Sequence, residues 1–489
     1  MRHSIVRRMV ETGTSTRASS AASGAVGGVQ ATMQTTEVVK DSQGHTVGKT
    51  WKTYFRWSPT SKDEIVAAEK RLLNTLVKTP YVQEQVNIGS GPPGSAVRWF
   101  RSVSNKPRFI NTITFDKAGS DAPTIVMVHG YGAAQGFFFR NYDALAERFR
   151  VLAIDQIGWG ASSRPDFTCK STEETESWFV DSLEEWRKAK GLDKFILMGH
   201  SLGGYVCSRY ALKHPEHVEH LVLVGTAGFS HQSERLDEFR QTWKGVIANA
   251  IWEANFTPQK LVRSLGPWGP QVVRRYTGAR FGTYASGLVL EEEESKLLSD
   301  YIFHTLAARP SGELCLKYIF SLGAFARLPL TQSAPDWKVP TTFIYGTEDW
   351  MDWRGAQHAV ELMTVPTEII RVPQGGHFVF MDNPELFHAS VIYACRNYLS
   401  AKSGDPVHNL PEGLIIPPRL GTGGAAEESG SNLFVNADSP CVGDCFMDLL
   451  KALHGTTIIA GFETRNSMDS LHMNHSYDVM VMIVLMPLF

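Results

Sequence analysis

A serine at a strand-to-helix turn is the most informative chemical feature of the chain. The motif G-x-S-x-G at 199–203 follows the apolar run 195–198 and precedes the helix-like stretch 205–214. We therefore expect Ser201 at a sharp turn between a buried strand and a helix. A serine hydroxyl becomes an effective nucleophile when it is held exposed beside a base. The alternative interpretation of 199–203 is an ordinary glycine-rich loop.

Two further residues occupy the positions that a serine nucleophile requires. Asp349 and His377 each come just after an apolar run of strand length. The order serine, acid, histidine predicts a triad in which His377 takes the Ser201 proton and Asp349 orients the imidazole. Taken singly, the acid could be a turn residue and the histidine an ordinary loop residue. Glu348 and Asp352 are the competing acids, and the position directly after the strand favours Asp349.

Backbone groups for stabilising an oxyanion are also predicted. The apolar run 124–128 leads into the tetrapeptide His-Gly-Tyr-Gly at 129–132. We expect the backbone N–H groups of Tyr131 and of Leu202, the residue after the nucleophile, to face the developing negative charge. The alternative for 129–132 is a strand-ending turn, which is compatible with this role.

The spacing of apolar runs indicates an α/β fold. Six strand-length runs alternate with helix-length segments, which predicts a mostly parallel sheet with helices on both faces. The expected strands are 124–128, 151–154, 195–198, 221–224, 342–345 and 368–372. An antiparallel lead-in pair is expected at 97–100 and 110–114.

A long interruption of this alternation predicts a helical lid. Helical patterning fills the block at about 229–338, including 236–254 and 291–308. Because the block follows a strand end, it is placed to cover the serine. Its aromatic residues favour a long hydrophobic substrate, although they could instead form the core of the lid itself. These aromatics are Trp243, Trp252, Phe256, Trp268 and Phe281.

Composition divides the chain into four parts. Residues 1–50 are rich in Ser, Thr, Gly and Ala and predict a disordered or targeting tail. Residues 51–89 hold four aromatics beside basic residues, then an amphipathic helix opened by Ser61. The aromatics suit either a lipid surface or packing on the main domain, which spans 90–400. Residues 401–489 form a tail of uncertain order.

Bulk properties exclude several classes of protein. The 489 residues have a formal net charge of -2, which gives no indication of nucleic acid binding. The six cysteines are scattered without a C-x-x-C pair, so reduced thiols and a cytoplasmic location are expected, with no metal site. No apolar run reaches the ~20 residues of a membrane-spanning helix.

Several motifs together resemble a known family, the α/β-hydrolase-domain 4 and 5 subfamily. The similarity extends over about 57–399 and is greatest to the plant members, soluble 1-acylglycerol-3-phosphate acyltransferases. The stretches concerned are 128–132, 137–141, 155–160, 163–167, 199–203, 345–349 and 376–382. The resemblance implies an α/β-hydrolase fold and acylation of lysophosphatidic acid to phosphatidic acid, with triacylglycerol lipase and phospholipase activity. It also implies acyl-CoA as co-substrate and no bound cofactor.

The resemblance adds a second motif, His-x4-Asp, which the family associates with acyl transfer. Here it corresponds to His377 and Asp382. Asp382 also precedes Asn383-Pro384-Glu385 and the helix-like stretch 386–399, so it could be a helix N-cap that contributes about 1 kcal/mol. The residues favour the cap over direct catalysis. A cap beside the histidine could also hold its loop.

Three functions remain open from the sequence. The first is a lipid acyltransferase and hydrolase that uses an acyl-enzyme on Ser201. The second is a plain serine esterase or lipase. The third is a regulatory scaffold on lipid droplets, which the presence of the serine disfavours. Peripheral attachment to membranes or lipid droplets, and an organelle transit peptide, stay open. A phosphate-bearing acceptor needs cations, but each of the four candidates is expected to be a solvated surface residue: Arg140, Arg164, Lys260 and Arg263.

Overall fold

The computed structural model describes residues 60–91, 106–119, 121–229, 234–281, 290–399 and 409–418. The described residues all belong to one compact unit, Phe55–Phe489. The expected N-terminal tail, the aromatic residues at 51–57, the expected strand at 97–100 and most of 401–489 lie outside the described residues.

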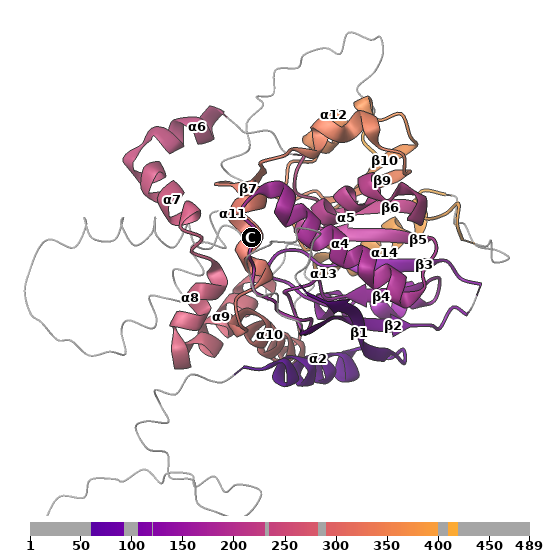
Figure 1. Ribbon diagram of the computed structural model, residues 1–489. Coiled ribbons are helices and arrows are strands. Elements are labelled where there is room, and N and C mark those ends of the chain that lie inside the picture. Colours follow the sequence, from indigo (N-terminus) through magenta and orange to yellow (C-terminus); the bar gives the residue numbers. More distant parts are fainter. Residues whose placement is uncertain are drawn as a thin grey trace, which may run out of the picture. The chain divides into compact units, whose positions relative to one another are not determined.

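An eight-stranded sheet forms the centre of the domain (Figure 1), in the order β1-β2-β4-β3-β5-β6-β9-β10. The strands are β1 (Val82–Ser90), β2 (Pro107–Phe115), β3 (Thr124–Val128), β4 (Arg150–Ile154), β5 (Phe195–His200), β6 (Val218–Val224), β9 (Thr341–Gly346) and β10 (Thr367–Val372). All pairings from β4 through β10 are parallel, whereas β1–β2 and β2–β4 are antiparallel. The predicted α/β architecture and its six parallel strands are confirmed.

The antiparallel lead-in pair exists, but its first strand was assigned wrongly. The partner of β2 is β1, with Val86 opposite Ile110 and Val82 opposite Thr114. The sheet therefore begins at Val82, before the boundary placed at residue 90. Because β1 is an edge strand and half polar, its sequence lacks the continuous apolar run that marks the buried strands.

Alternating residues of the strands contribute to two cores. On β3, Ile125 and Met127 belong to one core, and Val126 and Val128 to the other. One core is covered by α2 (Lys62–Leu76), α3 (Tyr142–Ala146), α13 (Val379–Asp382) and α14 (Pro384–Ala394). The other is covered by α4 (Thr172–Lys190), α5 (Leu202–Lys213) and α12 (Trp353–Leu362). Helices therefore cover both faces, as predicted.

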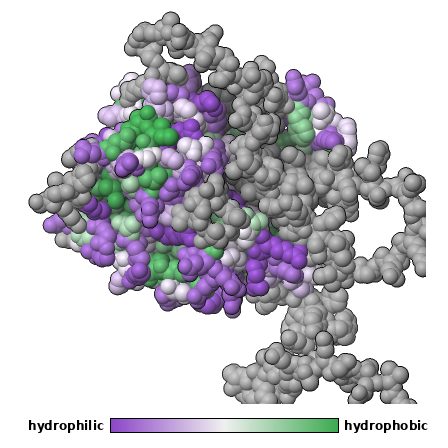
Figure 2. Space-filling view, turned by 180° about the vertical axis from the view of Figure 1, so that it is seen from behind, coloured by the Kyte–Doolittle hydropathy of each residue, from purple (hydrophilic) through white to green (hydrophobic). Residues whose placement is uncertain are grey.

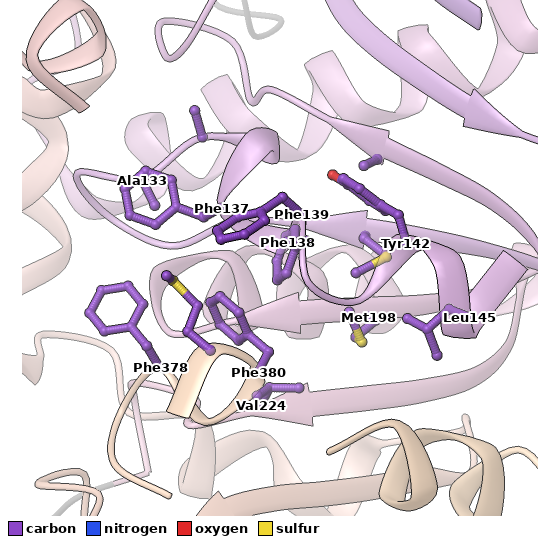
Figure 3. Packing of buried hydrophobic residues seen from close by; sticks show 14 of the residues in the cluster. Ala133, Phe137, Phe138, Phe139, Tyr142, Leu145, Met198, Val224, Phe378 and Phe380 are labelled. Atoms are coloured by element: carbon purple, nitrogen blue, oxygen red, sulfur yellow. The ribbon is translucent and has the colours of Figure 1, made fainter. Parts of the chain in front are cut away.

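Aromatic rings fill the first core beside the predicted histidine loop. Phe138 and Phe380 pack with ring centroids 4.7 Å apart, and Phe137 and Phe378 with centroids 6.1 Å apart. Figure 3 shows these side chains meeting between η1 (Gln135–Phe138) and the segment that follows His377. Close packing of rings at this position limits the freedom of that segment.

Helix α2 docks through a buried carboxyl group. Ser61 caps the helix by accepting from Glu64 N at 3.1 Å, as its motif predicts. Glu69, 0% exposed, accepts from the Tyr301 hydroxyl at 2.8 Å and from Asn111 Nδ2 at 3.1 Å. Burial, and then the neighbouring Asp155, raise the pKa of Glu69 to about 8.

The block between β6 and β9 is largely helical and lies beside the sheet, with α6 and α7 outermost in Figure 1. Its elements are α6 (Glu234–Gln241), α7 (Trp243–Glu253), α8 (Pro258–Ser264), η3 (Gly266–Trp268), α9 (Gly269–Phe281), α10 (Glu292–Ala307), η4 (Gly312–Cys315), α11 (Leu316–Ile319), β7 (Phe320–Ser321), β8 (Phe325–Ala326) and η5 (Leu330–Asp336). The expected helix at 236–254 is two helices, because Thr242 is extended and caps α7 by accepting from Gly245 N.

Of the five predicted lid aromatics, two are buried, two are exposed and one, Phe256, is half-buried. Trp252 and Phe281 are buried in the cores of the whole domain: Phe281 belongs to the first core, where its ring packs against Phe378, and Trp252 belongs to the second. Trp243 and Trp268 are 63% and 57% exposed.

In the view from behind in Figure 2, apolar residues form separate patches among hydrophilic ones. Within the described ranges, no helix has the length and apolar character needed to cross a bilayer.

Part of the expected C-terminal tail is docked on the sheet. In the described segment 409–418, Ile415 forms an isolated antiparallel bridge with Arg371 of the edge strand β10. Arg371 N donates to Ile415 O at 2.7 Å, and Ile415 N donates to Arg371 O at 3.0 Å. Gln357 Nε2 on α12 donates to Pro418 O at 3.0 Å. This segment therefore covers one edge of the sheet.

Candidate active site

Ser201 stands at a strained turn between β5 and α5. Its backbone has φ 53° and ψ -119°, a left-handed conformation that costs a residue with a side chain about 1–3 kcal/mol. Its N–H donates to Val224 O at 3.0 Å, and its own carbonyl accepts from Tyr205 N at 3.1 Å. Hydrogen bonds to β6 and α5 therefore hold the strained residue in place.

The glycines of the motif are required by close backbone contacts. A Cβ added to Gly203 would lie 2.3 Å from His129 O, and one added to Gly199 would lie 2.6 Å from Gly203 O. Both distances are far below van der Waals contact, and the neighbouring atoms belong to the backbone. The turn can therefore form only without side chains at these two positions.

The structure brings Ser201, His377 and Asp349 together in one hydrogen-bonded chain. His377 Nε2 lies 3.0 Å from Ser201 Oγ, and His377 Nδ1 lies 2.9 Å from Asp349 Oδ1. The same Asp349 oxygen accepts from Met351 N at 2.9 Å, which fixes the carboxylate. Because the carboxylate accepts from Nδ1, Nε2 is left to accept the serine proton. The side chains of His377 and Asp349 are only 6% and 1% exposed.

The competing acids have other roles. Asp352 is the N-cap of α12 and accepts from Arg354 N at 3.0 Å. The backbone N–H of Glu348 donates to Gly375 O at 2.9 Å. Among the three acids, Asp349 is thus the one whose carboxylate contacts the imidazole of His377.

A second histidine supports the first, and the sequence analysis missed it. His200 Nε2 lies 2.9 Å from the carbonyl oxygen of His377, with the two rings 4.7 Å apart. Because a carbonyl only accepts, Nε2 must carry the proton. Burial, and then the neighbouring His377, hold the pKa of His200 well below its ordinary value. His200 is therefore a neutral donor, and nothing in its sequence position reveals this contact.

The predicted oxyanion residues line the same cavity as the triad. Tyr131 and Leu202 border it together with Ser201 and His377. Leu202 is the first residue of α5, where helix N–H groups lack partners within the helix. The loop that contains Tyr131 is held by His129, whose Nδ1 lies 2.8 Å from Gly130 O. Burial lowers the pKa of His129, so its ring is a neutral anchor for the loop.

The cavity beside the serine is small and mostly apolar. Its space open to water is about 30 Å³, enough for one or two water molecules. Lid and loop residues close it, including Leu316, Phe320, Trp350 and Phe378. An acyl chain needs far more space, so these elements must separate before a lipid can reach Ser201.

Asp382 is not the N-cap of the last helix, and that expectation is wrong. Asn383 caps α14, accepting from Leu386 N at 3.3 Å, with Pro384 in the first turn. Asp382 Oδ2 accepts from the backbone N–H of Gly376 at 3.0 Å, and Oδ1 lies 3.5 Å from Arg280 Nη1. Asp382 therefore holds the loop that bears His377. Neither of these partners is a reacting group.

Three of the four basic candidates are not solvated surface residues. Arg140 pairs with Glu294 at 2.7 Å, and Arg263 Nη1 donates to Glu313 Oε2 at 3.0 Å. Arg164 donates to three backbone carbonyls, and burial lowers its pKa to about 10. Arg140 and Arg164 connect the lid to loops that follow the strands, whereas Arg263 and its partner Glu313 both lie within the lid. Among the residues the structure describes, no group of His, Cys, Asp and Glu side chains is arranged to hold a metal ion.

Comparisons with known proteins bear on the fold and the reaction. Residues 123–384 match the model of a family described as alpha/beta hydrolase fold. A probable 1-acylglycerol-3-phosphate O-acyltransferase of Oryza sativa subsp. japonica is 69% identical over 75% of this chain and 89% of its own length. A 1-acylglycerol-3-phosphate O-acyltransferase of Arabidopsis thaliana is 68% identical over 75% of this chain and 88% of its own length. A (lyso)-N-acylphosphatidylethanolamine lipase of Mus musculus is 34% identical over 58% and 83%.

Proposed function

Since the chain belongs to the α/β-hydrolase fold family, in the α/β-hydrolase-domain 4 and 5 subfamily, we propose that it is an acyltransferase that converts lysophosphatidic acid to phosphatidic acid. The reaction uses Ser201, His377 and Asp349. The observation that best supports this is the hydrogen-bonded chain from Ser201 Oγ through the imidazole to Asp349. The choice of lysophosphatidic acid as substrate rests on the names of the plant relatives.

The first half of the reaction makes an acyl-enzyme. Ser201 Oγ attacks the donor's acyl carbonyl while His377 Nε2 takes the serine proton, and Asp349 stabilises the imidazolium. The N–H groups of Tyr131 and Leu202 stabilise the oxyanion, a contribution of several kcal/mol. With acyl-CoA as donor, the C–S bond breaks and the thiolate leaves with the proton from His377.

The second half of the reaction releases the product. The free hydroxyl of lysophosphatidic acid gives its proton to His377 Nε2 and attacks the acyl-enzyme carbonyl. The tetrahedral intermediate collapses, the bond to Ser201 Oγ breaks, and the proton returns to the serine. Phosphatidic acid leaves, and the protein is restored.

Water at the same step would give hydrolysis, so the mechanism also predicts triacylglycerol lipase and phospholipase activity. The mouse relative named as a lipase supports this extension. The balance between transfer and hydrolysis depends on how far the lid excludes water while the lysolipid is bound, because a lid that excludes water slows hydrolysis of the acyl-enzyme.

We also propose that the protein is cytoplasmic and works peripherally on a membrane or lipid droplet. Helix α7 supports the peripheral attachment, since three apolar side chains are exposed on one side of the helix. Trp243, Val246 and Ile247 are 63%, 59% and 47% exposed. Lys244 lies beside this apolar side, with its Nζ 5.8 Å from the centre of the Trp243 ring. Apolar side chains beside cations suit a surface of anionic phospholipid.

The test supplies labelled lysophosphatidic acid and acyl-CoA to the purified full chain, to Ser201→Ala and to His377→Ala. We expect both variants to lose phosphatidate formation and acyl-CoA hydrolysis together, by at least about 10³-fold. Persistent transfer by Ser201→Ala would exclude the acyl-enzyme. In that case His377 would act directly as the base for the acceptor hydroxyl.

Two other functions would give different results in the same assay. A plain esterase or lipase would release fatty acid without forming phosphatidate. A lipid-droplet scaffold would do neither. The buried, hydrogen-bonded triad favours the first of these over the scaffold.

A further inference from the structure

Arg280, on the lid helix α9, lies in the aromatic wall next to the histidine loop. Its residue is 5% exposed, and its guanidinium lies 5.0 Å from the ring centre of Phe281 and 5.1 Å from that of Phe378. Phe378 lines the cavity at Ser201. Arg280 of the lid therefore contacts Phe378, a ring that borders the cavity at Ser201.

A buried ion pair links this arginine to the loop of His377. Arg280 Nη1 lies 3.5 Å from Asp382 Oδ1, and both side chains are at most 6% exposed. The second carboxylate oxygen of Asp382 accepts from Gly376 N at 3.0 Å. One carboxylate therefore joins the lid helix to Gly376, the residue immediately before His377.

The rest of the loop is held from other directions. His200 binds the carbonyl of His377 at 2.9 Å, and Asn383 Nδ2 donates to Pro373 O at 3.0 Å. The Asp382 contact connects this loop to the lid helix α9, together with the packing of Phe378 against Phe281, whose ring centroids are 5.5 Å apart. If the carboxylate turned away, Gly376 N would lose its acceptor inside a buried site, which is unfavourable.

From this geometry we propose that Arg280 and Asp382 are positioning residues that couple the docking of the lid helix α9 to the placement of His377. Arg280 keeps the Asp382 carboxylate directed at Gly376 N. The hydrogen bond from Gly376 N then fixes the backbone next to His377, and with it the position of the imidazole. With α9 in place, Nε2 stays within reach of Ser201 Oγ. When α9 moves away, Asp382 loses its cation and the imidazole loses this support.

The proposal deepens the proposed function and assigns the His-x4-Asp motif a mechanical role. The hydrogen bond between the Asp382 carboxylate and Gly376 N acts on His377 through the backbone. A displacement of about 1 Å between nucleophile and base can lower turnover by about 10²-fold. The pair is therefore expected to affect kcat more than substrate binding.

The test compares Arg280→Met, Arg280→Lys and Asp382→Ala in the full chain, with Arg274→Met, an exposed residue of the same helix, as control. Two rates are measured: acyl transfer to lysophosphatidic acid, and labelling of Ser201 by a fluorophosphonate. Melting temperatures verify that each variant folds. Labelling reports on the Ser201–His377 pair without any lipid acceptor, so it remains informative if acyl transfer is absent.

We expect Arg280→Met and Asp382→Ala to lower kcat and the labelling rate by about 10–100-fold, with KM changed by less than about threefold. Arg280→Lys should recover most of the loss, and Arg274→Met should match the unaltered protein. The double variant Arg280→Met/Asp382→Ala should be no worse than the worse single variant, because the two residues act in series.

Several outcomes would overturn the proposal. Independent, multiplicative losses in the double variant would show that the two residues do not act together. A raised KM for lysophosphatidic acid with kcat and labelling intact would make Arg280 a contact for the substrate phosphate instead. Failure of the proposed function looks different: the unaltered protein would be labelled at Ser201 yet form no phosphatidate.

Discussion

His200 Nε2 donates to the backbone carbonyl of His377 across 2.9 Å, so the residue before the nucleophile holds the chain that bears the base. Since β5 ends at His200, the sheet itself fixes both partners of the Ser201–His377 pair. Burial keeps His200 neutral, so it adds no charge that would oppose protonation of His377. The separation of 3.0 Å between Ser201 Oγ and His377 Nε2 follows from this common support.

Replacing the acid should distinguish Asp349 from its neighbour Asp352. We expect Asp349→Asn to lower kcat by about 10⁴-fold with little change in fold, because an amide favours the wrong tautomer of His377. Asp352→Asn should stay within about twofold, since asparagine caps a helix as well as aspartate does. The measurement is the steady-state rate of acyl transfer or ester hydrolysis. Equal losses in the two variants would contradict the assignment of the acid.

The nucleophile turn should not tolerate a methyl group at Gly203. In Gly203→Ala the new Cβ would meet His129 O at 2.3 Å, so we expect a loss of about 1–3 kcal/mol in stability and about 10²-fold in turnover. Gly278→Ala on α9 is the matched control, because nothing lies within 4 Å of its added Cβ. That control should stabilise α9 by up to about 1 kcal/mol. Thermal unfolding and kcat measure the two effects, and an active, stable Gly203→Ala protein would refute the close contact.

Stability should fall as the pH rises from the ordinary pKa of Glu69, 4.5, to its pKa of about 8 in the folded protein. The folded state holds the pKa of Glu69 at about 8, above its ordinary value of 4.5, so the unfolded chain releases this proton first. The contribution to stability is complete below pH 4.5 and is lost as the pH rises toward 8. Glu69→Gln mimics the protonated group, so it should flatten this part of the curve. Melting temperatures between about pH 5 and pH 9 provide the measurement, and identical curves for the two proteins would argue against it.

The exposed side of α7 should bind anionic phospholipid. We expect the variant with serine at Trp243, Val246 and Ile247 to bind phosphatidate-containing vesicles at least about tenfold more weakly, because each buried apolar side chain contributes about 1.5–3 kcal/mol. Leu362→Ser is the control, since Leu362 is 41% exposed on α12. Co-sedimentation measures the binding, which should weaken with salt. Unchanged binding by the triple variant would place the lipid contact elsewhere.

The parallel strands and the triad could be predicted because each depends on a local pattern. Buried strands are continuous apolar runs, and Ser201, Asp349 and His377 all follow such runs. Strand β1 was missed because an edge strand alternates apolar and polar residues. Asp382 was misassigned because both Asp382 and Asn383 are good N-caps, and only the backbone path decides between them.

Contacts between distant segments could not be predicted. His200 lies 177 positions from its partner His377, and Arg280 lies 102 positions from Asp382. The types of these residues do not reveal such partners. Likewise, Arg140 and Arg263 look like surface residues in the sequence, because the acids that neutralise them, Glu294 and Glu313, come from other elements.

The bridge between Ile415 and Arg371 bears on where the chain can be shortened. A protein that stops before residue 409 would retain every catalytic residue. It would expose the backbone N–H and C=O groups on the free edge of β10. Such a margin can recruit a strand from another molecule. Truncated proteins are thus expected to aggregate or dimerise while they retain catalytic activity. The residues around Ile415 therefore protect the solubility of the protein.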